Sequence, residues 1–164
     1  MAAPFDPECI FRVLAEYEVE YVLVGGLGAV LHGSPTMTND ADIVPQKVPA
    51  NLARLSQALG DLRARLRVAD DPKGVAFNPH PALLESMAML NMTTRCGDLD
   101  LTFAPAALTD YEALVTGSID VELGGYRVRV AALNDIIRSK EAADRPKDRA
   151  TLPLLRALSE EIGR

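Results

Sequence analysis

The chain is poor in aromatic residues and cysteine, and it has no long apolar run. Of its 164 residues, 5% are aromatic, none is Trp and two are Cys. The core must therefore be built mostly from Leu, Val, Ile and Ala, and no apolar segment is long enough to cross a bilayer. Cys9 and Cys96 have neither the spacing of a metal site nor that of a redox motif. We expect them to be ordinary, partly buried thiols.

A secretion signal and an overall basic charge are also missing. Asp6 and Glu8 stand near the start, in place of a basic segment followed by an apolar one, which favours a cytoplasmic protein with no membrane partner. The net charge of −6 argues against a surface built wholly for nucleic acid. Arg63, Arg65 and Arg67 alternate with apolar residues and would share one strand face, which is either a phosphate-binding face or a solvated one.

Positive charge gathers in the last third of the chain. Residues 127–156 contain four acidic side chains against eight basic ones, namely Arg127, Arg129, Arg138, Lys140, Arg145, Lys147, Arg149 and Arg156. This stretch is a candidate track for a nucleic-acid backbone, although the rest of the chain is acidic.

The remaining composition is that of one globular domain. The apolar fraction is 48% and the charged fraction 24%, and the length suits a single core. We therefore expect one domain over residues 1–164. Within it, residues 1–125 would form the catalytic sheet region, and residues 126–164 a hairpin strand and the C-terminal helices.

Periodicity and turn residues predict an α/β (α+β) fold with a small, mixed, twisted sheet and packed helices. We expect helices at residues 6–17, 25–32, 52–59, 111–115, 134–143 and from 146 to the C-terminus. We expect strands at residues 21–24, 40–44, 63–68, 87–95, 98–103, 119–123 and 126–130. Residues 70–74 are rich in turn-forming types, and residues 75–86 give no clear pattern.

Two aspartates one residue apart, Asp40 and Asp42, follow a glycine pair along the chain. Gly25 and Gly26 end the apolar run of residues 21–24. Side chains alternate along a strand, so both carboxylates face the same way and can reach one Mg²⁺. The glycines let the backbone approach a triphosphate, and the amides of the following helix can receive its charge. Either feature alone is common, whereas the combination is typical of nucleotide chemistry.

A third carboxylate is needed if two metal ions are to be held at a transferring phosphoryl group. Asp100 lies between Leu99 and Leu101 in a predicted strand, where an ionised group without a cation partner would be unfavourable. Asp98 would lie on the same face, but it follows Gly97 and is better explained as a turn residue. We therefore prefer Asp100 to Asp98.

These residues together resemble a known superfamily. Val24-Gly25-Gly26, Leu31-His32-Gly33, Thr38-x-Asp40-x-Asp42 and the later Asp100 are similar to the motifs of the DNA polymerase β-type nucleotidyltransferases. Residues 140–148, Lys-Glu-Ala-Ala-Asp-Arg-Pro-Lys-Asp, resemble the lysine and aspartate block of the AbiEii and MenT-type toxin branch. Relatives often carry Gly-Ser in place of the glycine pair, Arg in place of Thr36 and Asp in place of Thr151.

The resemblance implies a polymerase β-like fold and a reaction. Such enzymes move a nucleoside monophosphate from an NTP to an acceptor hydroxyl and release pyrophosphate, with one or two Mg²⁺ ions held by aspartates. Here Asp40, Asp42 and Asp100 would be the metal ligands. Asp100 would also take the proton of the attacking hydroxyl.

The resemblance also assigns the residues around the phosphates. Gly25, Gly26 and Thr38 would contact the nucleotide, and Lys140 would place a mobile charge on the triphosphate. Asp148 would either orient Lys140 or cap the helix that follows Pro146. In MenT-type relatives a Ser or Thr at the position of Thr38 is phosphorylated, which predicts regulation at this residue.

The acceptor has three candidate classes. The toxin branch implies the 3′ end of tRNA, with a cognate antitoxin protein as a further partner. An aminoglycoside or another small molecule is the first alternative, because polycationic drugs suit an acidic protein. An antitoxin-type or protein-binding module without catalysis is the second, although the presence of all three carboxylates opposes it.

Overall fold

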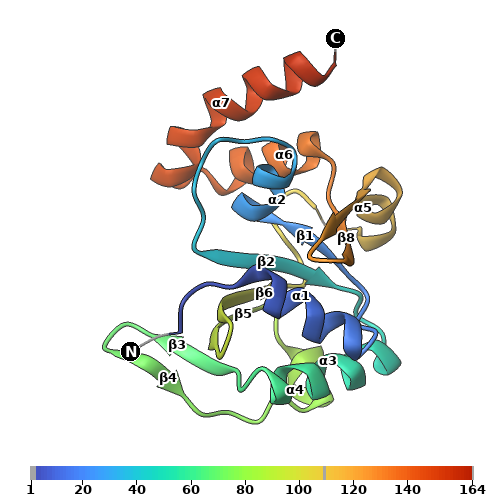
Figure 1. The fold of residues 1–164 in the computed structure, drawn as a ribbon, viewed down its shortest axis with the longest axis vertical. Coiled ribbons are helices and arrows are strands. Elements are labelled where there is room, and N and C mark those ends of the chain that lie inside the picture. Colours follow the sequence, from blue (N-terminus) through green and yellow to red (C-terminus); the bar gives the residue numbers. More distant parts are fainter. Residues whose placement is uncertain (1–2, 109, 164) are drawn as a thin grey trace.

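One eight-stranded mixed sheet organises the chain. The computed structural model describes residues 3–108 and 110–163, so the ends of the expected domain at residues 1, 2 and 164 lie outside it. The strand order is β4-β3-β5-β6-β2-β1-β8-β7 (Figure 1). The strands are β1 (Tyr21–Val24), β2 (Asp40–Pro45), β3 (Arg65–Val68), β4 (Asp71–Val75), β5 (Met89–Thr94), β6 (Gly97–Thr102), β7 (Ile119–Leu123) and β8 (Tyr126–Val130). The pairs β1–β8 and β2–β6 are parallel and the other neighbours antiparallel, which confirms the predicted α/β class.

Helices cover both faces of this sheet (Figure 1). They are α1 (Pro7–Glu16), α2 (Gly25–Leu31), α3 (Pro49–Asp61), α4 (Pro81–Ser86), α5 (Tyr111–Gly117), α6 (Leu133–Ala143) and α7 (Pro146–Ile162). On one face α1, α3 and α4 pack in a core with buried residues such as Leu23, Ile43 and Leu99. On the other face α2, α5, α6 and α7 pack around Val22 and Val24.

This second layer covers only part of its face of the sheet. Among the described residues, its buried core contains side chains of β1 and β2 and none of β3, β5 or β6. On β5, Met89 and Asn91 are exposed, and Asn91 pairs with Asp100 of β6. Exposed side chains of β5 therefore continue this face of the sheet beyond Asp100.

The helix starts and most strand positions agree with the sequence. Asp6 caps α1 by accepting a hydrogen bond from the Cys9 amide at 3.2 Å. The turn expected at residues 70–74 holds for Asp70, but it was wrong for residues 71–74, because Asp71–Val75 forms edge strand β4. An edge position tolerates Pro72, which has no amide hydrogen to donate to a ladder. Residues 75–86, which gave no pattern, end β4 and supply α4.

Two predictions about side chains also change. Arg63 has a φ of 53° and lies outside β3, so only Arg65 and Arg67 of the three arginines belong to the strand. Cys9 and Cys96 are joined in a disulfide, with their Cα atoms 5.7 Å apart and a sequence separation of 87, so the expectation of two thiols was wrong. The link ties α1 to the turn before β6, and a loop of this length restricts the unfolded chain considerably.

Within residues 3–108 and 110–163, no helix combines the length and the hydropathy that a membrane span requires.

Candidate active site

Three aspartates from two paired strands meet above the sheet. In the parallel register of β2 and β6, Asp42 lies opposite Asp100 and Asp40 lies opposite Asp98. Carboxylate oxygens of Asp40, Asp42 and Asp100 all lie within 4.8 Å of one another. Asp98 is not part of this group and instead pairs with Arg67. The structure thus brings together the three aspartates that the sequence singled out.

The surroundings of the cluster favour a bound cation. Burial, followed by the charge of Asp42, raises the pKa of Asp100 to about 7. Burial, followed by the charge of Asp40, also raises the pKa of Asp42. The buried Oδ1 of Asp100 lies 3.0 Å from Arg67 Nη2 but accepts no hydrogen bond of good geometry from the described residues. Closely spaced carboxylates are the hard oxygen ligands that Mg²⁺ prefers, so the residues fit a divalent ion.

The raised pKa of Asp100 predicts that the metal-free protein becomes less stable as the pH rises from about 4 to about 7. In this window the folded protein keeps a proton on Asp100, whereas the unfolded chain, with a pKa of 3.8, has released it. The folded state then binds more protons, so the free energy of unfolding falls with rising pH. Urea unfolding in EDTA between pH 4.5 and 8 measures this, and Asp100→Asn should flatten the curve. An unchanged slope in that variant would contradict the assignment.

Gly25 places α2 directly against the cluster. It has a φ of 69°, in the left-handed region that favours glycine. A Cβ atom at this position would overlap the Asp42 carboxylate, whereas at Gly26 it would meet Thr38, whose nearest atom, Oγ1, lies at 3.4 Å. Both glycines line the cavity in front of the aspartates. The first glycine is therefore required by the position of Asp42.

For the nucleotide transfer that the sequence predicts, we expect Gly25→Ala to lower the rate about 100-fold. The stability should fall by about 1–3 kcal/mol, because the new methyl group displaces Asp42 and strains the backbone. Gly60→Ala is the matched control. Gly60 lies in α3 with no neighbour within 4 Å of the added Cβ, so this change should stabilise the protein by about 0.5–1 kcal/mol. Initial rates and thermal unfolding of both variants measure these effects. A fully active Gly25→Ala protein would contradict the proposed close contact.

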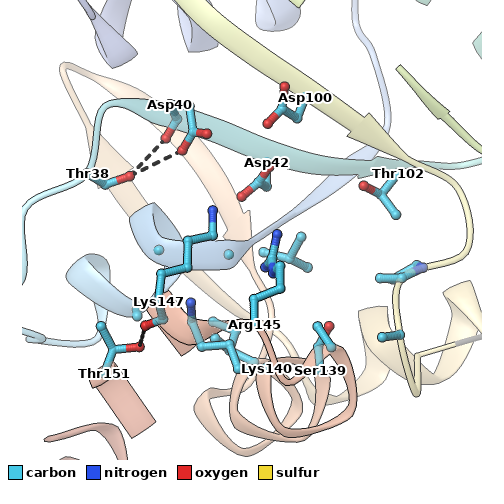
Figure 2. A pocket seen from close by; sticks show the side chains of 18 of the residues that line it. Thr38, Asp40, Asp42, Asp100, Thr102, Ser139, Lys140, Arg145, Lys147 and Thr151 are labelled. Atoms are coloured by element: carbon cyan, nitrogen blue, oxygen red, sulfur yellow. Dashed lines mark hydrogen bonds between the residues drawn. The ribbon is translucent and has the colours of Figure 1, made fainter. Parts of the chain in front are cut away.

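A cavity of about 600 Å³ lies between the carboxylates and the corner that joins α6 to α7. Lys140, Arg145 and Lys147 line the wall across from the aspartates (Figure 2). Met89, Asn91 and Thr102 continue the strand wall beyond Asp100. The cavity therefore joins a cluster of acidic ligands to several cations, which is the charge pattern that a metal-bound triphosphate requires.

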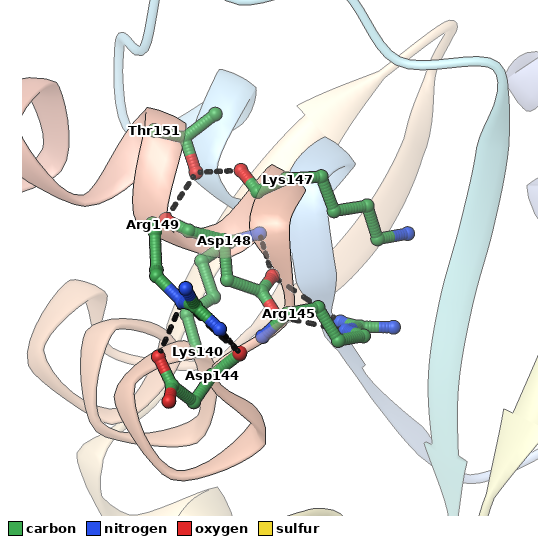
Figure 3. Close-up of polar contacts among 7 residues, drawn as sticks. All are labelled: Lys140, Asp144, Arg145, Lys147, Asp148, Arg149 and Thr151. Carbon is green, nitrogen blue, oxygen red and sulfur yellow. Dashed lines mark hydrogen bonds and ion pairs between the residues drawn. The ribbon is translucent and has the colours of Figure 1, made fainter.

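Asp148 holds this cationic corner together (Figure 3). Its side chain is fully buried and accepts hydrogen bonds from the Arg145 amide at 3.2 Å and from Arg145 Nε at 2.7 Å. Lys140 Nζ lies 3.5 Å from its Oδ1. Burial raises the pKa of Asp148, but the hydrogen bonds and charges of Arg145 and Lys140 outweigh it and hold that pKa below its usual value. The sequence offered two roles for Asp148, capping the helix after Pro146 or orienting Lys140. In the structure Asp148 both caps α7 and contacts Lys140.

Thr38 and His32 have defined partners. The Thr38 hydroxyl lines the cavity and donates to the backbone oxygen of Asp40 at 3.2 Å. His32 lies at the C-terminal end of α2, and its Nε2 is 2.8 Å from the carbonyl oxygen of Ala131, which follows β8. This contact agrees with a packing role for the histidine.

The basic stretch of residues 127–156 is largely neutralised. Six of its eight basic side chains form ion pairs: Arg129 with Glu20, Arg138 with Asp135, Lys140 and Arg145 with Asp148, Arg149 with Asp144, and Arg156 with Glu141. The stretch therefore offers less positive charge to a nucleic-acid backbone than its composition indicates.

The sequence interpretation missed two groups near the site. Arg145 and Lys147 were counted as part of the basic stretch and of the block at residues 140–148, without a role of their own, although both line the cavity. The Arg67 contact with Asp98 and Asp100 was also missed. The run from Arg145 to Asp148, a proline-started helix, was the available signal for the first group.

Comparisons with known proteins support the fold. The sequence matches no family model and no curated protein. Among solved structures, the lincosamide antibiotic adenylyltransferase LnuA, bound to lincomycin, matches with a TM-score of 0.60 and 15% identity over 94% of this chain and 99% of its own. The antibiotic-resistance factor ANT(2'')-Ia matches with a TM-score of 0.58 and 15% identity over 95% of this chain and 82% of its own. TM1012 of Thermotoga maritima, assigned as a nucleotidyltransferase, matches with a TM-score of 0.56 and 16% identity over 96% of this chain and 97% of its own.

At these identities the likeness concerns the fold. It covers nearly the whole chain in each case. The AbiEii and MenT-type branch stays a prediction. The chain has the fold of the nucleotidyltransferases.

Proposed function

We propose that the protein is a Mg²⁺-dependent nucleotidyltransferase that moves a nucleoside monophosphate from an NTP to an acceptor hydroxyl. The single observation that carries this proposal is the convergence of Asp40, Asp42 and Asp100 opposite a cationic wall in one cavity. A binding module without catalysis has no need for three carboxylates kept so close together. Because the substrate is an NTP, we place the reaction in the cytoplasm.

In this reaction the acceptor oxygen forms a bond to the α-phosphorus, and the bond from that phosphorus to the bridging oxygen breaks. Pyrophosphate leaves with the electron pair, and Asp100 takes the hydroxyl proton. Lys140, Arg145 and Lys147 hold the phosphates, with Gly25 and Gly26 at the backbone side. Bound Mg²⁺, held by the three aspartates, would supply charge neutralisation at the transferring group.

The proposed acceptor is the 3′ end of tRNA, which would make the protein a toxin with a cognate antitoxin partner. Its support is the resemblance of residues 140–148 to the toxin branch and the exposed side chains of Met89 and Asn91 beyond Asp100. A small-molecule acceptor is the second candidate. It is favoured by the ion pairs that neutralise the basic stretch and by the lincosamide adenylyltransferase fold that spans nearly the same length.

Incubation with each α-labelled NTP, Mg²⁺ and one acceptor at a time tests both candidates. Separate reactions contain total tRNA, tobramycin or lincomycin, and Asp42→Asn serves as the inactive control. Label on tRNA supports the toxin proposal, and label on a drug supports the second candidate. Label on neither, with NTP and Mg²⁺ still bound, directs the search to protein acceptors. Failure to bind NTP contradicts the enzymatic proposal.

Phosphorylation of Thr38 is the proposed means of regulation. A phosphate here adds about two negative charges beside Asp40 and Asp42 and fills the space of the triphosphate. We expect Thr38→Glu to lower transfer by at least about tenfold, because the new carboxylate repels the NTP phosphates. Thr38→Ser, which keeps a hydroxyl, should retain most of the activity. Equal rates for the two variants, measured with labelled NTP, would contradict this mode of regulation.

A further inference from the structure

Arg67 reaches the edge of the carboxylate cluster from a strand that is not adjacent to it. It lies on β3, and β5 separates this strand from β6. Its Nη1 is 3.3 Å from Asp98 Oδ2, and its Nη2 is 3.0 Å from Asp100 Oδ1. Nη1 also donates to the Met92 carbonyl oxygen on β5 at 3.3 Å. The guanidinium is thus tied to the intervening strand and to two carboxylates of β6.

The Asp100 carboxylate forms an ion pair with this guanidinium and also lies close to the carboxylates of Asp40 and Asp42. A cation bound by Asp40, Asp42 and Asp100 would compete with Arg67 for the Asp100 carboxylate. Asp98 lies two residues before Asp100, outside the cluster, and binds the other arm of the same guanidinium. The planar fork of arginine suits this double contact, whereas the single ammonium of lysine does not.

We propose that Arg67 and Asp98 are a positioning pair that sets the orientation of Asp100 and tunes the affinity of the cluster for a divalent cation. This inference rests on the proposed function, because it concerns the same metal centre. Arg67 orients Asp100 and opposes the cation. Asp98 binds one arm of the guanidinium, which weakens the attraction between Arg67 and Asp100 and so limits the competition with the cation.

The pair predicts effects of opposite sign on metal affinity. Arg67→Met should tighten metal binding about tenfold, because a competing positive charge near the site is lost. Asp98→Asn should weaken it about threefold or more, because Arg67 then concentrates on Asp100. Arg67→Lys keeps the charge and loses the fork, so its affinity should stay within about threefold of the wild type.

Arg65→Met is the matched control. Arg65 lies on the same strand, two residues earlier, but its guanidinium binds backbone carbonyls, that of Lys73 at 2.8 Å and that of Gly74 at 3.1 Å. This variant should leave the affinity of the metal centre unchanged. It reports any general effect of removing an arginine from β3.

Titration of the full chain with Mn²⁺ alone, followed by electron paramagnetic resonance, measures these affinities without NTP or turnover. The transfer reaction then gives kcat, which should fall in Arg67→Met although its metal binding is tighter. Opposite shifts in Arg67→Met and Asp98→Asn, with Arg65→Met unchanged, support the inference. If the wild type binds Mn²⁺ but the two substitutions change its affinity in the same direction or not at all, this inference is overturned. The proposed function is not overturned by that result. A wild type that binds no Mn²⁺ overturns the metal centre and this inference together.

Discussion

Asp42→Asn is expected to abolish nucleotide transfer while making the metal-free protein more stable. Asp42 lies at the centre of the proposed metal site, opposite Asp100 in the register of β2 and β6. Loss of a central metal ligand should lower the rate about a thousandfold or more. The same change removes the negative charge of Asp42. Burial and the nearby charge of Asp40 make that charge unfavourable, and both raise the pKa of Asp42. The stability should therefore rise by about 1 kcal/mol in EDTA.

The two effects are measured with labelled NTP and with urea unfolding. Asp120→Asn is the control, because Asp120 is an exposed carboxylate on edge strand β7. It should leave both rate and stability unchanged within error. Full activity of Asp42→Asn would exclude the carboxylate cluster as the reaction centre. A loss of activity together with a loss of stability would show that Asp42 acts mainly through the fold.

Asp148→Ala should have the second largest effect, on both stability and transfer. The carboxylate is fully buried, and its removal leaves the Arg145 amide without its acceptor and Lys140 without its partner. Breaking a buried charge pair in this way costs about 3 kcal/mol. Since the side chains of Lys140 and Arg145 line the cavity, we also expect nucleotide transfer to fall about 100-fold, with a higher KM for the NTP.

Glu141→Ala is the matched control for Asp148→Ala. Glu141 lies in α6, and its ion pair with Arg156 is well exposed on both sides, at 42% and 55% of the side-chain surface. Such pairs contribute little, so the stability should change by less than about 1 kcal/mol. Steady-state kinetics at a temperature where all variants are folded separate the two roles. Equal effects of the two substitutions would contradict the central position of Asp148.

Much of the fold could be predicted from local patterns. The apolar run of β1, the glycine pair and the alternating aspartates of β2 each specify a short segment by its own residues. Asp100 could be placed because an ionised group between two leucines requires a partner. These inferences needed no knowledge of which strands are neighbours.

The errors concern contacts between distant parts of the chain. Cys9 and Cys96 are 87 residues apart, and no spacing rule connects them. Arg67 meets Asp100 across β5, which lies between β3 and β6, and the order of segments in the sequence does not reveal this arrangement. Strand β4 was missed because its residues are turn formers, and its pairing with β3 overrides their local preference.

The cationic wall depends on one backbone feature. Asp144 ends α6 with a φ of 50°, in the left-handed region, and turns the chain into α7. This corner presents Arg145 and Lys147 to the cavity and lets Lys140 reach Asp148. A sequence shows such a turn only weakly, because aspartate is one of several residues that adopt it.

The most direct test of the central claim is a crystal structure with Mn²⁺ and a non-hydrolysable NTP analogue. We expect an anomalous peak at about 2.0–2.3 Å from carboxylate oxygens of Asp40, Asp42 and Asp100, with the triphosphate against Lys140, Arg145 and Lys147. Nucleotide bound elsewhere, or a cavity with nucleotide but no ion at the three aspartates, would contradict the account.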